Sequence, residues 1–302
     1  MREPLSRLLN NLNQVMVGKQ DAIRLVMVAI LAHGHVLLED VPGVGKTLLA
    51  KALARSIAGQ FHRIQCTPDL LPTDLTGTNI WNPQTASFEF RPGPVFTNIL
   101  LVDEVNRATP RTQSALLEVM EETQATIDGV TYDLPQPFFV IATQNPVEYQ
   151  GTFPLPEAQL DRFALALSLG YPAETEELQM LQRLQTPQSF TSLEPCLSLE
   201  DIQMLRLQVQ EVRIKDPLQK YILALVRATR DTDHITLGVS PRGTVILYRA
   251  AQALAFLEGR DYAIPDDVKY LAPHVLSHRL ITAGGRNNQA LVHELLETVA
   301  IP

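Results

Sequence analysis

The sequence has few cysteines and no long apolar run, and these absences exclude several classes of protein. Cys66 and Cys196 are its two cysteines and no C-x-x-C pair is present, so neither a disulfide framework nor a zinc site is expected. His33 and His35 lack further metal-ligand types nearby and are interpreted as structural. They also interrupt the apolar stretch 25–38, which is too short to span a bilayer. With no N-terminal signal peptide, we expect a cytoplasmic protein that does not insert into membranes.

Positive charge is also scarce. The chain has 25 Lys and Arg against 33 Asp and Glu, and its net charge of −8 disfavours sequence-independent binding to nucleic acid. The hydrophobic fraction of 45% and the charged fraction of 19% are ordinary for a globular protein. A chain of 302 residues can bury a large core, and its length predicts two domains.

The most informative segment is the glycine-rich stretch 40–47, which follows a predicted strand at 36–39 and precedes a helical pattern. Its glycines let backbone N–H groups cradle phosphate oxygens, and the helix start adds the positive end of its dipole. Lys46 is expected to reach the β- and γ-phosphates, and the Thr47 hydroxyl to ligate Mg²⁺. Asp40 replaces the first glycine of the usual G-x-x-x-x-G-K-[ST] motif, at a position that closes the turn. The predicted nucleotide-binding residues here are Pro42, Gly43, Val44, Gly45, Lys46, Thr47 and Leu48.

The first half of the chain alternates apolar strands with helical patterns, which is typical of a parallel sheet covered by helices. Strands are predicted at 36–39, 62–65, 99–102, 138–143 and 164–169. A stretch at 67–94, rich in Pro, Thr, Gly and aromatic residues, predicts an insertion with a hairpin. After residue 172 the pattern becomes helical. Helices are predicted at 174–184 and from Ser198, Pro217, Pro241 and Pro265, with a Pro/Ser/Thr-rich linker at 186–195.

Two acidic residues follow the apolar strand predicted at 99–102. An acid at the carboxyl end of a central strand faces the phosphate site of an open α/β sheet. Asp103 therefore suits the outer coordination of a Mg²⁺ ion held by Thr47. Glu104 is placed to orient and deprotonate an attacking water.

Three further polar residues occupy suggestive positions. Asn145 ends the next strand, where it could hold the water or the γ-phosphate or could simply belong to a proline turn. Arg162 stands at a helix-to-strand junction, and Arg242 stands in the first turn of a helix. From position alone, each arginine is equally well explained as a surface residue.

Together these motifs occur in the order found in an AAA+ ATPase, and several stretches resemble the MoxR branch of that family. The stretches that carry the resemblance are 37–47, 93–96, 102–108, 138–146 and 155–163. The resemblance extends over nearly the whole chain. It implies an α/β fold, an AAA+ P-loop NTPase core with a parallel five-stranded sheet, followed by a small all-α lid domain.

The chain is accordingly divided into three parts. An αβα ATPase core is expected at 1–172, a linker at 173–198 and a helical lid domain at 199–302. The family places a β-hairpin insert in helix 2, here at about 68–95, and a second hairpin before the sensor-1 strand, here at about 125–135.

The resemblance also implies roles for matching residues. Lys46 and Thr47 match Walker A, Asp103 and Glu104 match Walker B, and Asn145 matches sensor 1. The implied cofactors are ATP and Mg²⁺.

Two arginines and a short N-terminal segment complete the implied site. Arg162 matches the arginine finger that acts on ATP held by a neighbouring subunit, and Arg242 matches the sensor-2 residue that the lid carries onto the nucleotide. Val17 and Gly18 match the segment that packs beside adenine. Because each site is completed in trans, the family forms rings, usually hexameric.

Members of this branch are linked to chaperone-like remodelling or maturation of partner protein complexes, often together with a protein containing a von Willebrand factor A domain. The alternative is an AAA+ nucleic-acid motor or clamp-type ATPase. The predicted hairpin segments 80–90 and 126–134 contain no Lys or Arg, which favours a protein client over nucleic acid. Trp81, Phe88 and Phe90 either grip that client or pack the insert's own small core.

Overall fold

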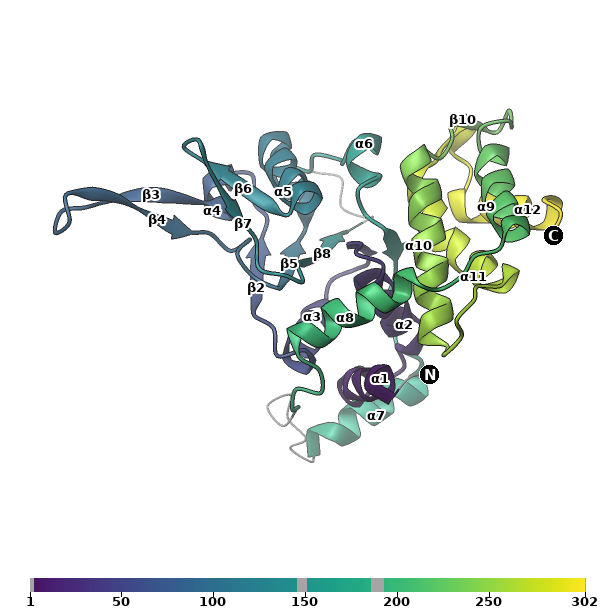
Figure 1. Ribbon diagram of the computed structural model, residues 1–302, viewed down its shortest axis with the longest axis horizontal. Coiled ribbons are helices and arrows are strands. Elements are labelled where there is room, and N and C mark those ends of the chain that lie inside the picture. The colour runs from purple at the N-terminus through teal and green to yellow at the C-terminus, as the bar shows by residue number, and fades with distance from the viewer. Residues whose placement is uncertain (1–2, 146–150, 186–192, 302) are drawn as a thin grey trace.

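The computed structural model describes residues 3–145, 151–185 and 193–301. Its centre is a parallel five-stranded sheet in the order β2-β5-β8-β1-β9 (Figure 1). These strands are β1 (Val36–Glu39), β2 (Phe61–Gln65), β5 (Ile99–Asp103), β8 (Phe139–Gln144) and β9 (Leu165–Leu167). Each lies within two residues of its predicted range, so the predicted sheet is confirmed. Pro146, the last residue of the stretch 138–146, lies outside the described residues. So do residues 186–192 of the predicted linker.

Strand side chains alternate between two faces, and each face builds its own hydrophobic cluster. On β1, Val36 and Leu38 join one cluster, and Leu37 joins the other. The first face is covered by α1 (Glu3–Val15), α2 (Gln20–Leu31) and α3 (Lys46–Ser56). The second is covered by α5 (Pro110–Glu122) and by the region of α4 (Pro72–Thr76). The near-continuous apolar runs of the strands are thus explained by burial on both faces.

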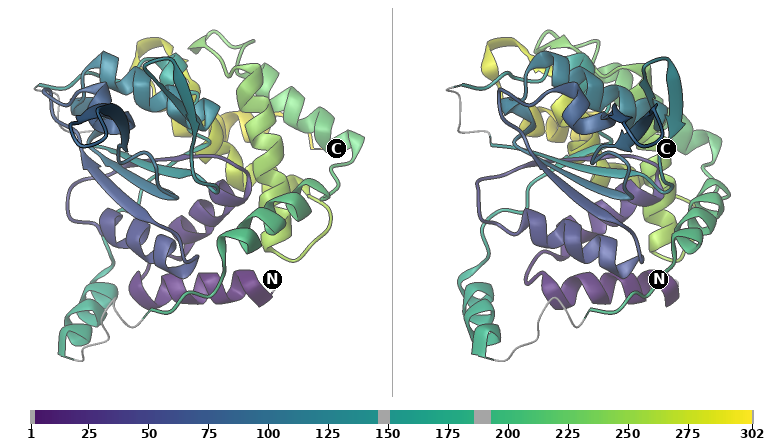
Figure 2. Two further views of the ribbon diagram at one scale, coloured as in Figure 1. Left: turned by 60° about the vertical axis from the view of Figure 1, so that its left-hand side comes forward. Right: turned by 90° about the vertical axis from the view of Figure 1, so that its left-hand side faces the viewer.

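Two hairpins extend from the region of α4 and α5. One is formed by β3 (Gly77–Asn82) and β4 (Ser87–Pro92), the other by β6 (Gln124–Ile127) and β7 (Val130–Asp133). The β3–β4 hairpin projects far from the body (Figure 1), and in the views of Figure 2 it comes toward the viewer. Phe90 of this hairpin stacks on Tyr132 of the other, with ring centroids 4.1 Å apart. Asn79 Nδ2 also donates to Asp128 Oδ2 at 2.7 Å, so the two hairpins brace each other.

The short α6 (Glu157–Leu160) precedes β9, α7 (Glu174–Gln185) follows it, and a helical lid completes the chain. Its helices are α8 (Leu199–Gln210), α9 (Asp216–Ala228), α10 (Pro241–Leu257), α11 (Pro265–Leu276) and α12 (Asn288–Thr298). α8 begins with the predicted capping box, in which Ser198 and Asp201 each bond the other's backbone N–H. Buried residues of α8–α12 belong to the same cluster as those of α1–α3, so lid and core share one hydrophobic core.

Several short elements were not predicted. Strands β10 (Ile235–Leu237) and β11 (Ile281–Thr282) pair as an antiparallel ribbon in the lid. Within the described part of the chain, 3₁₀ turns form at η1 (Val105–Arg107), η3 (Ser277–Arg279) and η4 (Ala283–Gly285). Elements of two or three residues are too short to show a periodic pattern. Across the described ranges, no helix has the length and apolar character needed to cross a bilayer.

His35 connects the sheet to α5 within the core. Its Nδ1 accepts from the Val140 N–H at 3.0 Å, so its protonated Nε2 donates to the Met120 carbonyl, also at 3.0 Å. Burial lowers the pKa of His35 to about 4, with a smaller lowering from Arg206, and the bond to Met120 opposes this shift. The imidazole is therefore neutral in the folded protein at neutral pH.

The depressed pKa of His35 predicts acid sensitivity. Neutral His35 contributes its full stability above pH 6.5, the ordinary value, and the contribution is lost as the pH falls toward about 4. Between pH 7 and pH 5 this loss should amount to about 2 kcal/mol of unfolding free energy. His35→Gln does not titrate, so its stability should fall by that much less. Urea unfolding at both pH values measures the difference, and equal losses in the two proteins would contradict a neutral His35.

Candidate functional site

A hollow of about 350 Å³ lies at the carboxyl ends of β1, β5 and β8. Nine predicted site residues line it: Pro42, Gly43, Gly45, Lys46, Thr47, Leu48, Asp103, Glu104 and Asn145. Val44 instead packs against the hydrophobic core. The structure thus brings together in one place most of the residues predicted to hold nucleotide and metal.

The loop that enters the hollow needs its glycines. Gly43 and Gly45 have φ of 90° and 100°, in the left-handed region that disfavours other residues. Among the described residues other than its two chain neighbours, none has an atom within 4 Å of a Cβ built on Gly43, so the loop presents open backbone there. Gly45 directly precedes α3, whose first N–H groups face the loop. This cradle fits a bound phosphate group.

Asp40 fixes the base of this loop, a role that the sequence pattern did not reveal. It is 4% exposed, and its carboxylate accepts from the Ser168 hydroxyl at 2.6 Å and from the N–H groups of Leu169 and Gly170. Its backbone oxygen accepts from Lys46 Nζ at 3.1 Å. The residue in place of the usual first glycine therefore ties the loop to the segment after β9.

Asp103 is held from both neighbouring strands. Arg63 Nε on β2 donates to its Oδ2 at 2.6 Å, and the Thr143 hydroxyl on β8 donates to its Oδ1 at 3.2 Å. Thr47 lines the same hollow and offers a hydroxyl oxygen. A carboxylate and a hydroxyl are hard oxygen ligands that suit Mg²⁺, which usually takes its remaining ligands from phosphate and water. The residues present therefore fit the implied metal.

Glu104 has an uncommon backbone conformation. Its φ of 56° lies in the left-handed region, which costs energy for a residue other than glycine. Its N–H donates to Thr143 Oγ1 at 2.9 Å, and its Oε2 accepts from Gln65 Nε2 at 2.7 Å. Arg107 Nε lies 3.2 Å from the same carboxylate oxygen. These contacts hold the carboxylate within the hollow.

Three of these partners, Arg63, Gln65 and Thr143, were missed by sequence reasoning. A signal was available, because Arg63 and Gln65 stand two residues apart and so share one face of β2, and Thr143 lies near the end of β8.

Cys66 directly follows Gln65, but burial raises the pKa of its thiol to about 12, with smaller contributions from Asp103 and Glu104. Cys66 is thus protonated and is not a nucleophile.

Arg162 and Arg242 lie elsewhere. Among the described residues that line the hollow, neither is present. Both instead form ion pairs with Glu121 near the end of α5, Arg162 through Nε at 3.0 Å. The resemblance predicts that the lid carries Arg242 onto the nucleotide. In this chain Arg242 shares Glu121 with Arg162, and its contact with nucleotide stays a prediction. Glu121 drew no attention in the sequence because an acid on an amphipathic helix is common.

Val17 and Gly18 lie in the turn between α1 and α2, outside the phosphate hollow. Gly18 lines a separate hollow of about 550 Å³, together with Tyr171. The adjacent Met16 reaches the phosphate loop, since its Cε lies 3.2 Å from a Cβ built on Gly45. The N-terminal segment is therefore beside the loop, and its contact with adenine stays a prediction.

Comparisons with known proteins agree with this architecture. The family described as "ATPase family associated with various cellular activities (AAA)" matches residues 35–165, and the AAA lid domain matches residues 227–297. The chain is 52% identical to the uncharacterized protein YeaC of Bacillus subtilis (strain 168), over 99% of this chain and 95% of that one. It is 40% identical to Chaperone MoxR1 of Mycobacterium tuberculosis, over 99% of this chain and 82% of that one. A crystal structure of a candidate ATPase from Cytophaga hutchinsonii matches with a TM-score of 0.92 at 40% identity, covering 99% of this chain and 95% of that one.

The parallel sheet, the glycine-rich loop between β1 and α3 and the helical lid are together the architecture of a P-loop ATPase of the AAA class. The identity to MoxR proteins extends along nearly the full chain and includes the lid. The chain belongs to the MoxR family of AAA ATPases.

Glu104→Gln tests the predicted base. The amide keeps the shape of the carboxylate but cannot accept a proton, so turnover should fall by roughly 10²–10⁴-fold while nucleotide binding persists. Lys46→Ala should instead lose nucleotide affinity, since it removes a phosphate-binding cation. A coupled ATPase assay and a fluorescent-nucleotide titration separate the two effects, with Glu118→Gln on exposed α5 surface as the matched control. Wild-type turnover in Glu104→Gln would show that another group is the base.

Proposed function

We propose that this chain is a Mg²⁺-dependent, cytoplasmic ATPase that forms a hexameric ring and couples ATP hydrolysis to remodelling or maturation of partner protein complexes. The observation that carries the proposal is that Lys46, Thr47, Asp103 and Glu104 line one hollow. They offer a phosphate-binding cation, two metal ligands and a base, which are the parts that phosphoryl transfer to water requires. The name Chaperone MoxR1 of one relative supports the chaperone-like role.

In the proposed reaction, the loop at 42–47 binds the triphosphate through its backbone N–H groups and through Lys46. Thr47 and Asp103 are the residues that would hold Mg²⁺, which neutralises charge on the phosphates when bound. Glu104 orients a water molecule and takes its proton as the water attacks the γ-phosphate.

Neighbouring side chains keep this base in place. Thr143 binds the backbone of Glu104 and the carboxylate of Asp103, so both acids keep a fixed relation to β8. Gln65 directs the Glu104 carboxylate from the other side. Asn145 lines the same hollow and is proposed to hold the water or the γ-phosphate.

The positions of two arginines support a site completed by a second copy of the chain. Arg162 and Arg242 meet at Glu121, away from the chain's own phosphate loop. A cation that stabilises charge on the transferred phosphoryl group must contact it. We therefore place both arginines on the nucleotide of a neighbouring copy in the ring, with Glu121 neutralising them in the separate chain.

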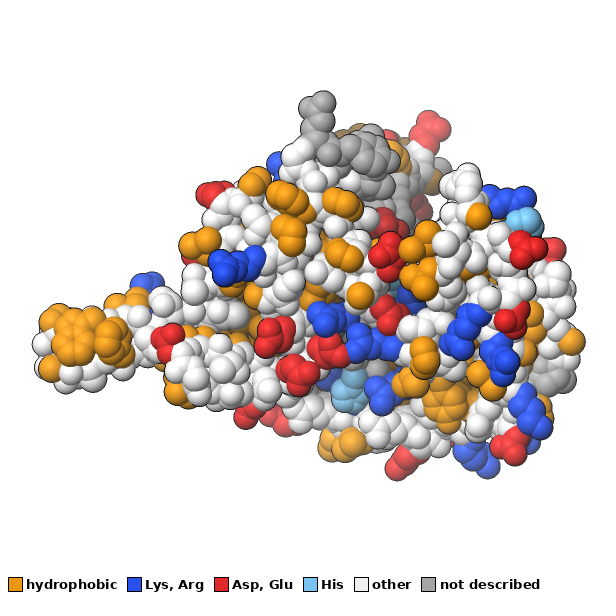
Figure 3. Space-filling model, turned by 90° about the horizontal axis from the view of Figure 1, so that it is seen from above, with side chains coloured by type: hydrophobic (Ala, Val, Ile, Leu, Met, Phe, Trp, Pro, Cys, Tyr) orange, Lys and Arg blue, Asp and Glu red, His pale blue; other side chains and the backbone are white. Residues whose placement is uncertain are grey.

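The β3–β4 hairpin is the proposed client contact. Trp81 is 50% exposed and Phe88 is 70% exposed, and their rings pack edge to face with centroids 5.3 Å apart. Figure 3 shows hydrophobic side chains gathered at the far end of this hairpin, away from the body. Phe90, by contrast, packs against Phe96 and Tyr132. Exposed aromatics suit apolar protein surface. We propose that the client or its adaptor, such as a von Willebrand factor A domain protein, binds here.

Mixing two inactive variants tests the site in trans. Arg162→Ala should keep nucleotide binding but lose turnover, because the finger acts only on the transition state. Lys46→Ala lacks a working pocket but keeps its finger. In mixed rings, an intact pocket can face an intact finger, so ATPase activity should return over a range of mixing ratios. No recovery in rings shown to be mixed would contradict a finger that acts in trans.

Replacing Trp81 and Phe88 by Ala tests the client surface. Basal hydrolysis should be largely retained, and stimulation by a candidate von Willebrand factor A domain protein should be lost. Val130→Ala, at an exposed hydrophobic position on the other hairpin, is the matched control.

The acidic chain should show neither DNA binding in filter assays at about physiological salt nor DNA-stimulated ATPase activity. Tight, salt-sensitive DNA binding that raises turnover would favour the nucleic-acid motor instead.

A further inference from the structure

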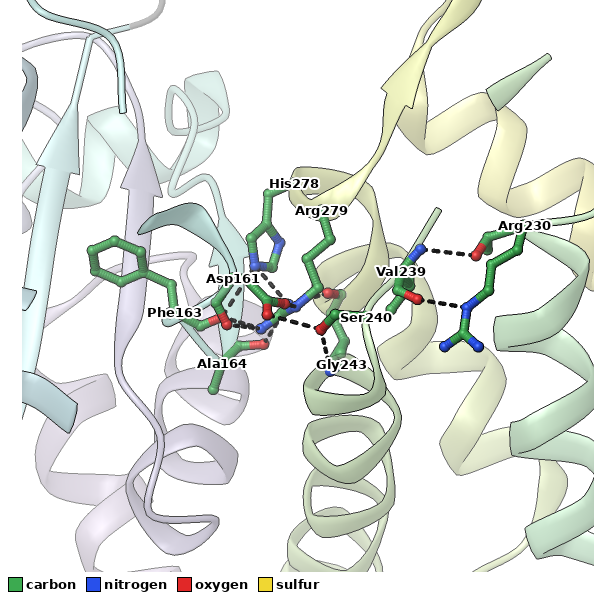
Figure 4. A network of polar contacts seen from close by, with 11 residues as sticks. Asp161, Phe163, Ala164, Arg230, Val239, Ser240, Gly243, His278 and Arg279 are labelled. Atoms are coloured by element: carbon green, nitrogen blue, oxygen red, sulfur yellow. Dashed lines mark hydrogen bonds and ion pairs between the residues drawn. The ribbon is translucent and has the colours of Figure 1, made fainter. Parts of the chain in front are cut away.

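One buried arginine binds the main chain on both sides of Arg162. The side chain of Arg279 is 1% exposed, and its Nε donates to Asp161 Oδ1 at 2.8 Å (Figure 4). The same guanidinium donates to the backbone oxygens of Asp161, Phe163 and Ala164. Arg279 belongs to the lid, whereas these acceptors belong to the core. The conformation around Arg162 is therefore fixed by a residue more than a hundred positions away in sequence.

Asp161 extends this network to the helix that carries Arg242. Its Oδ2 accepts from the Ser240 hydroxyl at 2.8 Å, and Ser240 is the N-cap of α10. A Cβ at Gly243 would clash with Val239 Cγ1 and lie 3.1 Å from Arg279 Cδ, so the first turn of α10 packs closely against both side chains. The start of α10 and the segment with Arg162 are thus held by one hub, composed of Asp161, Ser240 and Arg279.

The chemistry of Arg279 suits the placement of several groups at once. Burial lowers its pKa to about 10, which Asp161 opposes, so the guanidinium stays charged at neutral pH. Burial and Arg279 together hold the pKa of His278 well below its ordinary value, and its neutral Nε2 lies 2.6 Å from the Arg279 guanidinium. A buried ion pair adds little net stability, because desolvation offsets the attraction. A rigid fork of five donors, however, can bind several acceptors with one fixed geometry.

We propose that Arg279 is a positioning residue for the finger, holding the main chain at 161–164 so that Arg162 reaches the nucleotide of the neighbouring copy. The inference rests on the proposed function, because that function assigns Arg162 its role. Through Asp161 and Ser240, the same hub keeps Arg242 in register with Arg162. The lid thereby determines how the finger is presented, although the finger belongs to the core.

Arg279→Lys is the direct test. Lysine keeps the charge beside Asp161 but lacks the planar fork that binds three carbonyl oxygens of the core and that of Val275 in the lid. The variant should keep its circular dichroism spectrum, nucleotide affinity and KM, while kcat should fall by about 10- to 100-fold because the finger is misplaced. Amide hydrogen exchange in a peptide covering 157–164 should become faster. The matched control is Arg260→Lys, which alters a similar ion pair to Asp267 inside the lid and should keep wild-type kcat.

A double-mutant cycle decides whether Arg279 acts through Arg162. In an Arg162→Ala background, Arg279→Lys should cause no further loss of kcat. If Arg279→Lys does not fold, Asp161→Asn replaces it in the cycle. Wild-type kcat in a folded hub variant, or the same fold-loss with and without Arg162, would overturn the positioning role. Wild-type kcat in Arg162→Ala alone would refute the finger itself, which is a different failure.

Discussion

In a parallel sheet every strand ends at the same edge, and this constraint governs the candidate site. The phosphate loop follows β1, Asp103 ends β5 with Glu104 directly after it, and Thr143 lies near the end of β8. Strand register then sets distances, since Gln65 pairs with Asp103 and Val102 pairs with Ala142. Side chains at these ends can therefore form hydrogen bonds directly, and Thr143 bonds to two consecutive residues of the neighbouring strand. The precision of the site comes from backbone pairing that is itself buried on both faces.

The second organising feature is the union of lid and core. Their buried side chains form one hydrophobic cluster, so the lid is packed as part of the same body. The Arg279–Asp161 ion pair adds directional contacts where the start of α10 meets the core segment before β9. As a result, the phosphate loop and the two arginines are held in fixed relation but on separate surfaces. This separation supports the proposed ring, in which neighbouring copies would complete one another's sites.

The hairpins combine an anchored base with an open tip. Phe90 and Tyr132 stack where the two hairpins meet, whereas Trp81 and Phe88 pack mainly on each other. The aromatics of the insert thus separate into a packed residue, Phe90, and an exposed pair, Trp81 and Phe88, which the sequence could not tell apart. Exposed aromatic side chains on a chain with a net charge of −8 suit the proposed protein client better than a phosphate backbone.

The sequence by itself determined the local parts. The apolar strands, the glycines of the phosphate loop, the Asp103–Glu104 pair and the Ser198 cap are encoded within a few neighbouring residues, where periodicity and turn chemistry are strong signals. Only the tertiary structure decided which distant groups meet. Asp40 with the segment after β9, Arg63 with Asp103, Glu121 with two arginines and Arg279 with Asp161 each join residues from separate elements. No local pattern carries such pairings, because they depend on how sheet and lid pack together and on which side chains that packing removes from water.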